Sequence, residues 1–167
     1  MLDPTWGASF SVTAAFRGRA PLLAGVRMLV SDLCSQCLEH REESALLVMA
    51  VQELMENLVK YSEGGDDLLR FELCVLQDQP TARICTRNRV SSEHRGAVVD
   101  LVSRIVAAPD ANALYDEMVA SSGERDGSRL GLIRVRAEAG LALSYSVESD
   151  RLSIAATRPV QPKARER

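Results

Sequence analysis

Apolar residues recur at intervals of three and four in two consecutive segments of the chain. The first segment opens at Pro21 and runs to about residue 38, and the second runs from about Ser44 to Tyr61. This spacing gathers apolar side chains into one stripe, and proline is favoured in a first helical turn. The pattern therefore predicts two amphipathic helices. The positions of the second helix expected to face inward are Leu47, Val51, Leu54, Met55 and Leu58.

Alternating apolar and polar residues, rich in β-branched types, predict strands elsewhere. The predicted strands cover residues 8–16, 69–76, 81–86, 141–147 and 152–156. Helical composition returns over 91–120, with a break at Pro109-Asp110, and over 130–139, where Gly140 ends the helix. The order β-α-α-β-β-α-α-loop-α-β-β predicts an α+β fold. We expect a two-layer α/β sandwich whose mixed, mostly antiparallel sheet is covered on one face by helices.

Length and composition narrow the class of protein. A chain of 167 residues that is 46% hydrophobic fits one domain, which we place at 1–158, followed by a disordered basic tail at 159–167. The net charge of -3 gives no basic excess for nucleic acid or anionic lipid. Without a long apolar run or a secretory signal at the N-terminus, the sequence predicts a cytoplasmic protein that binds no membrane.

The four cysteines include a C-x-x-C pair, a spacing that can serve zinc binding or redox chemistry. Cys34 and Cys37 fall within the first predicted helix, whereas Cys74 and Cys85 fall within predicted strands. No clear second pair or histidine partner accompanies the C-x-x-C, so we expect buried free thiols that serve packing. The two histidines, His40 and His94, lie in charged surroundings and are expected at the surface.

Three polar residues of the second predicted helix share one narrow stripe. Glu53, Asn57 and Lys60 are separated by four and three residues, so they project from the same side over about 10 Å. An amide oxygen can bind Mg²⁺, an ammonium can meet phosphate, and a carboxylate can orient a nucleophile. The alternative is an ordinary solvated face stabilised by a Glu56–Lys60 pair. Spacing alone leaves both open.

Two short motifs favour the first interpretation. The string ELMENLVKYS at 53–62 resembles the N-box of the histidine-kinase-like (GHKL, Bergerat-type) ATPases, and GSRLGL at 127–132 resembles the later glycine box of that family. The likeness covers roughly residues 40–157. Within the family it points to small bacterial serine/threonine kinases and anti-sigma-factor-like regulators of partner-switching systems, including the SiaB-like group. The amides at a glycine-rich helix start can hold phosphate.

The resemblance implies a site that binds ATP and Mg²⁺. Glu53 would be the general base, Asn57 the Mg²⁺ ligand and Lys60 a phosphate contact. Backbone beside the lid would come from Gly127, Gly131 and Leu132.

The chain also departs from the family. The usual Asp-x-Gly-x-Gly box is missing, so Asn88 would offer its amide oxygen to adenine. Arg129 replaces a glycine, and it would either contact phosphate or fill the site.

The resulting hypothesis is a signalling regulator that acts on a small partner protein. It would be a serine/threonine protein kinase or an anti-sigma-type partner-switching protein, and its partner an anti-anti-sigma (STAS-type) antagonist or similar regulator. Analogy with the resembling kinases implies a homodimer. The alternative is a degenerate module of the same fold that binds a partner protein without ATP. A sensor histidine kinase is disfavoured, because His40 is the only histidine upstream of the N-box.

Overall fold

The computed structural model describes residues 8–17, 21–61, 68–76, 80–121 and 130–163. Five strands form one sheet in the order β1-β2-β3-β5-β4. They are β1 (Ala8–Arg17), β2 (Leu68–Leu76), β3 (Thr81–Arg89), β4 (Ala142–Glu148) and β5 (Arg151–Pro159). All four pairings between these strands are antiparallel.

The α+β sandwich expected from the sequence is confirmed, with one correction to the sheet. We predicted a mixed sheet, but the described strands contain no parallel pair. The connections explain this. β2 and β3 follow each other directly, as do β4 and β5, and adjacent strands joined by short links run antiparallel. The helix pair between β1 and β2 takes the chain up and back, so β2 also enters antiparallel to β1.

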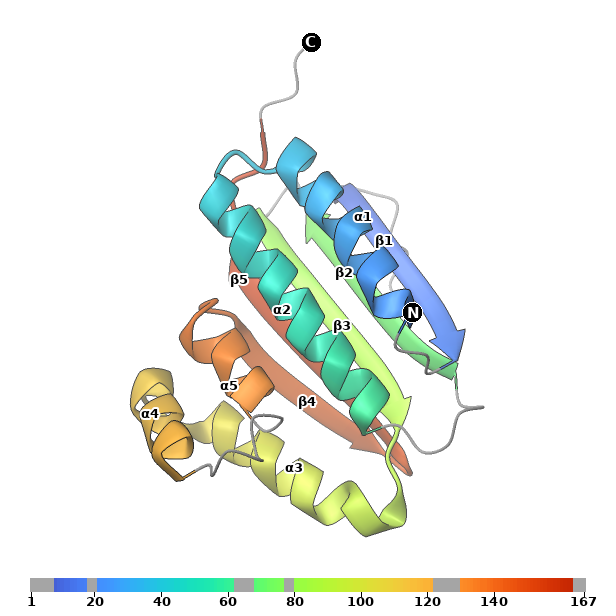
Figure 1. The fold of residues 1–167 in the computed structure, drawn as a ribbon, viewed down its shortest axis with the longest axis vertical. Helices are drawn as coiled ribbons and strands as arrows, with labels where there is room; N and C mark the ends of the chain where they lie inside the picture. Colours follow the sequence, from blue (N-terminus) through green and yellow to red (C-terminus); the bar gives the residue numbers. More distant parts are fainter. Residues whose placement is uncertain (1–7, 18–20, 62–67, 77–79, 122–129, 164–167) are drawn as a thin grey trace.

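Helices cover one face of the sheet. Figure 1 shows α1 (Pro21–Cys37) and α2 (Arg41–Lys60) lying side by side across it, while the other three helices gather beside β4 and β5. Those three are α3 (Ser92–Ala107), α4 (Ala111–Ser121) and α5 (Leu130–Ala137). The burial of β3 alternates accordingly: Ala82, Ile84, Thr86 and Asn88 are buried, whereas Arg83 and Arg89 are exposed.

The five α2 residues expected to face inward are all buried in the main apolar cluster. The helix begins at Arg41, three residues earlier than predicted. Glu42 and Glu43 occupy its first turn, where carboxylates interact favourably with the positive end of the helix dipole. His40, the residue before the helix, has extended backbone angles. The charged residues Glu42 and Glu43 therefore belong to α2 and not to the connection before it.

Two further boundaries differ from the prediction. β3 continues to Arg89, because Arg87, Asn88 and Arg89 pair in register with β5. This places Asn88 inside a central strand and not in the loop that follows. The chain is also ordered beyond residue 159, where we expected disorder to begin. Val160 is buried, and the Lys163 amide donates to the carbonyl of Cys37, so contacts with the end of α1 hold this segment.

The cysteines are free thiols. The prediction of burial is confirmed for Cys34 and Cys74, whereas Cys37 and Cys85 are half-buried. Burial raises the pKa of Cys34 to about 12, and the neighbouring Cys37 adds to this shift. His40 is exposed as predicted and hydrogen-bonds to Gln161. The side chain of His94 lies outside the described residues.

Within the described ranges, no helix is both long and apolar enough to span a membrane.

Candidate functional site

The two sequence motifs meet in the structure where α5 crosses α2. Gly131, in the first turn of α5, is buried against the side chains of Glu53 and Asn57. A Cβ atom at Gly131 would overlap the Glu53 carboxylate oxygen and would lie only 3.5 Å from Nδ2 of Asn57. A larger residue would displace the carboxylate, so glycine permits the close approach of the two helices. Residues 78 positions apart in sequence thus share one site.

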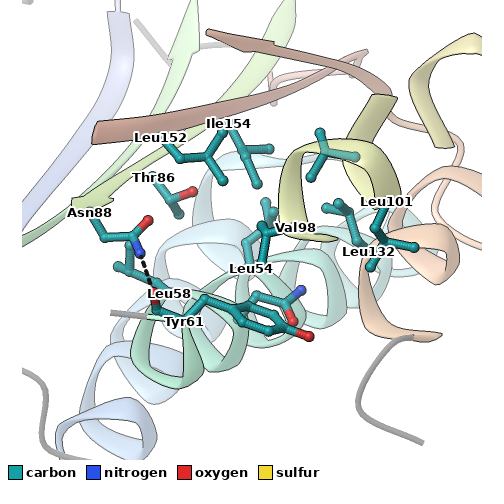
Figure 2. A pocket seen from close by; sticks show the side chains of 12 residues that line it. Leu54, Leu58, Tyr61, Thr86, Asn88, Val98, Leu101, Leu132, Leu152 and Ile154 are labelled. Carbon is teal, nitrogen blue, oxygen red and sulfur yellow. Dashed lines mark hydrogen bonds between the residues drawn. The ribbon is translucent and has the colours of Figure 1, made fainter. Parts of the chain in front are cut away.

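A cavity opens beside this contact, between the helices and the sheet. Figure 2 shows Thr86, Leu152 and Ile154 on its sheet side, facing Leu54, Leu58 and Tyr61 of the α2 side, with α3 and α5 closing it. The full lining is Leu54, Asn57, Leu58, Tyr61, Thr86, Asn88, Val98, Leu101, Val102, Leu132, Leu152 and Ile154. The space that the centre of a water molecule can occupy inside it is about 20 Å³. This is room for about one water molecule.

Buried polar side chains mark the sheet wall of this cavity. Ser44, Thr86 and Asn88 are the buried polar residues within the described ranges, and two of the three line the cavity. The Asn88 amide nitrogen donates to the backbone carbonyls of Tyr61 at 3.2 Å and Arg89 at 3.1 Å, and the first of these bonds appears in Figure 2. Two acceptors on one side of the amide fix its orientation. The amide oxygen is left as the acceptor, and Asn88 ties β3 to the end of α2.

Glu53 is held by an ion pair that the sequence did not predict. Nη1 of Arg134 on α5 lies 2.6 Å from Oε1 of Glu53, whose side chain is only 15% exposed. The same guanidinium makes two 3.0 Å hydrogen bonds to Glu138, through Nε and Nη2. Tyr115 of α4 hydrogen-bonds to Glu138 in turn. Helices α2, α4 and α5 therefore meet in one network, in which Arg134 joins the Glu53 carboxylate to the Glu138 carboxylate.

The charges of this network shift the pKa values of its members. Burial raises the pKa of the Glu53 carboxyl above its ordinary value, although the charge of Arg134 opposes the shift. The hydrogen bond from Arg134 lowers the pKa of Glu138. The same hydrogen bond raises the pKa of Arg134. A part-buried carboxylate held by a positioned cation suits a group that accepts a proton from a hydroxyl.

The remaining predicted residues divide into three groups. Asn57, Asn88 and Leu132 line the cavity, and Glu53 and Gly131 lie directly beside it. Lys60 does not line the cavity: it is exposed at the end of α2, with Nζ 5.0 Å from the centroid of the Tyr61 ring. The Glu56 carboxylate accepts a hydrogen bond from Gln52, 2.9 Å away. Gly127 and Arg129 lie outside the described residues.

Sequence reasoning missed Thr86, Tyr61 and the ion-pair partners of Glu53. Thr86 stands two residues before Asn88, so the period of a strand places both side chains on one face. Arg134 and Glu138 are four residues apart on a helix that follows the glycine box, and this spacing predicts a pair. Neither pattern shows that Arg134 reaches Glu53, because that contact depends on how α5 crosses α2.

The oxygen-bearing side chains at the site are too few to hold a metal ion by themselves, so a metal would have to share its ligands with a bound phosphate. In the part of the chain that the structure describes, no cluster of three or more histidine, cysteine, aspartate or glutamate residues could hold a metal ion. Mg²⁺ is often bound by one or two protein oxygens together with phosphate oxygens and water. The Asn57 amide lines the cavity, one helical turn from Glu53. Asn57 would therefore supply one oxygen to a Mg²⁺ ion that enters together with a phosphate ligand.

Comparison with known proteins shows the fold. No model of a protein family matches the chain, and no curated protein matches it. A solved structure does: the crystal structure of the SiaB–SiaC complex from Pseudomonas aeruginosa contains a chain that superposes with a TM-score of 0.67. The match covers 88% of each chain at 16% sequence identity. At this identity the similarity establishes a common fold, and the site residues have to be judged on their own geometry.

Proposed function

We propose that the protein is a partner-switching signalling regulator that binds Mg²⁺-ATP and phosphorylates a serine or threonine of a small partner protein. The observation that carries the proposal is the meeting of two distant motifs at Gly131, Glu53 and Asn57. Each motif alone is weak. Their contact at the rim of a cavity, with Asn57 and Asn88 both in its lining, supports the proposal because it brings the two motifs and two side-chain amides to one place.

In this proposal each residue has one task. Asn57 offers its side-chain oxygen to Mg²⁺, which neutralises phosphate charge when bound. The start of α5 presents backbone amides near Gly131 toward the phosphates. Glu53 accepts the proton of the attacking hydroxyl, and Arg134 holds its carboxylate in place. Lys60 and Arg129 are proposed phosphate contacts.

The adenine side of the proposed site needs rearrangement. A purine occupies several times the space of one water, so the side chains of α3 that close the cavity have to move when a base enters. Val98, Leu101 and Val102 are the α3 residues that line the cavity, and the first two are labelled in Figure 2. The oxygen of the Asn88 amide is the proposed acceptor for the adenine amino group, since the amide nitrogen is the atom that donates within the protein.

A protein partner is the proposed substrate. The structural neighbour was solved as a complex of two proteins, SiaB with SiaC, and this supports a role in binding another protein. An anti-anti-sigma (STAS-type) antagonist or a similar small regulator is the class of partner that we propose. A cytoplasmic location and a homodimer are part of the same proposal, by analogy alone.

A second candidate function is a module of the same fold that binds its partner without ATP. Two observations favour it. The cavity has room for about one water, and the Asn88 amide nitrogen is already used within the protein. In this case the Glu53–Arg134 pair would serve only to join α2 and α5.

Titration calorimetry with Mg²⁺-ATP separates the two candidates. We expect saturable binding by the unchanged protein and, in Asn57→Ala, an affinity lower by at least about tenfold, because even indirect supports of metal ligands contribute that much. Gln52→Ala is the matched control, since Gln52 lies on the same helix outside the cavity. An unchanged protein that releases no binding heat would exclude the kinase and favour the module.

A further inference from the structure

A second concave surface lies on the opposite side of α2 from the cavity. It is a groove of about 500 Å³, as space open to the centre of a water molecule, between α1 and α2. Its lining is Arg27, Ser31, Ser35, Arg41, Ser44, Ala45, Val48, Met49 and Gln52. None of these residues lines the cavity. Because the sheet-facing residues of both helices are buried, the groove faces solvent; Figure 1 shows the two helices side by side.

Small side chains create the hollow. Ser31 and Ser35 on α1 and Ala45 on α2 leave space between two helices that are held together at one end, where the Ser44 hydroxyl donates to the carbonyl of Cys34 at 3.2 Å. The middle of the groove contains the half-buried apolar side chains of Val48 and Met49. The groove therefore combines a small-residue floor with apolar contacts in its middle.

Met28 extends this apolar character to the rim. It is three residues from Ser31 on α1, a spacing that puts both on one side of the helix. Its side chain is 68% exposed, the largest value among the exposed large hydrophobic residues of the described chain. Met28 therefore adds an exposed apolar side chain on the Ser31 side of α1, next to the lining.

Cations stand at both ends of the groove. Arg27, nearly two turns into α1, is the first α1 residue of the lining, and Arg41, the first residue of α2, lies at the end where α1 passes into α2. The α1 lining from Arg27 to Ser35 spans eight residues, so the two ends are about 12 Å apart. The Lys163 ammonium adds a third charge near the Arg41 end, where it donates to the Ser35 carbonyl at 2.8 Å.

The neighbouring acids do not line the groove. The Glu43 carboxylate accepts a hydrogen bond from the Gln161 amide. The Glu56 carboxylate accepts one from the side chain of Gln52, which is a lining residue, so Glu56 lies next to the groove without belonging to its lining. Asp32 and Glu42 are exposed next to lining residues without belonging to the lining themselves. The charged residues of the lining itself are thus both arginines, although the protein as a whole has a net charge of -3.

We propose that this groove docks an amphipathic helix of a partner protein that carries two carboxylates about two helical turns apart. An apolar helix face would rest on Met28, Val48 and Met49, and each carboxylate would meet one arginine. Two carboxylates seven residues apart on a helix are about 10 Å from each other, which the long arginine side chains can span. The inference rests on the proposed function only in taking a partner protein as the occupant.

The probe is a labelled synthetic helical peptide with one apolar face and two glutamates about seven residues apart, compared with a peptide that has lysines at those positions. Fluorescence anisotropy is expected to show saturable binding of the glutamate peptide. The double variant Arg27→Glu/Arg41→Glu is expected to bind it at least tenfold more weakly and to bind the lysine peptide instead. Arg151→Glu, an exposed arginine of β5, is the control and should change affinity less than twofold.

Several outcomes would overturn the proposal: no saturable binding by the unchanged protein, equal weakening by Arg151→Glu, or no gain of lysine-peptide binding in the double variant. Sedimentation velocity gives another. A self-association that the double variant abolishes would assign the groove to a second copy of this chain. Calorimetry with Mg²⁺-ATP on the same double variant keeps the two proposals apart, because groove and cavity share no residue.

Discussion

Replacing Asn88 with aspartate, the residue usual in the adenine box of the ATPases that the sequence resembles, is expected to destabilise the protein by about 2 kcal/mol at pH 7. The amide nitrogen of Asn88 donates to the carbonyls of Tyr61 and Arg89, and the side chain is only 7% exposed. A carboxylate oxygen in that place would face two acceptors and lose both bonds. The substitution that looks like a repair of the motif should therefore damage the fold.

Urea unfolding at pH 7 and pH 4 measures this effect. The destabilisation should shrink at pH 4, because burial favours the neutral form of the introduced carboxyl, and a protonated oxygen can donate a hydrogen bond. Asn112→Asp, on the exposed surface of α4, is the control and should leave stability nearly unchanged. Equal stability of Asn88→Asp and the unchanged protein at pH 7 would mean that the amide does not hold α2 to β3.

Arg134→Ala is expected to lower the free energy of unfolding by about 2 kcal/mol at pH 7, below the cost of breaking a fully buried pair because Arg134 is partly exposed. The substitution leaves the Glu53 carboxylate part-buried without its cation. Adding Glu53→Gln should restore much of the loss, since a neutral amide needs no counter-charge. Arg104→Ala is the control, because its ion pair with Glu117 is exposed on both sides and should contribute little.

The direction of the pH dependence follows from the two carboxyls of the network. Without Arg134, the pKa of Glu53 should rise further above its ordinary value of 4.5, so the variant loses stability as pH rises above that value. Glu138, whose pKa Arg134 lowers, stabilises the unchanged protein above the same ordinary value, and this contribution disappears as pH falls through its lowered pKa. Both effects make the loss of unfolding free energy caused by Arg134→Ala largest at neutral pH and smaller at acidic pH. A difference that stayed constant from pH 4 to pH 7 would contradict the assignment.

Much of the fold was predictable because the two periodicities are local. The apolar stripe of α2 predicted its five buried positions, and alternation predicted every described strand. The predictions were wrong where contacts with segments distant in the sequence determine the structure. β3 extends to Arg89 only because β5 is there to pair with it, and residues 160–163 are ordered only because they contact the end of α1. Neither partner is visible in the local sequence.

The site was predictable in part for a similar reason. The helix period placed Glu53 and Asn57 together, and the family resemblance pointed to Gly131 and Leu132. The Glu53–Arg134 pair and the commitment of the Asn88 amide depend on a helix crossing and on a strand end, which one sequence does not reveal. These two contacts are also what the ATP proposal and its alternative disagree about.

The central claim is that the α2 and α5 motifs form one nucleotide site. Amide spectra of the isotope-labelled protein, recorded with and without Mg²⁺-ATP, test it most directly. We expect saturable shifts centred on Asn57, Asn88 and Gly131, with the α1–α2 groove unaffected. Spectra that do not change with Mg²⁺-ATP, or that change only at residues remote from the cavity, would contradict it.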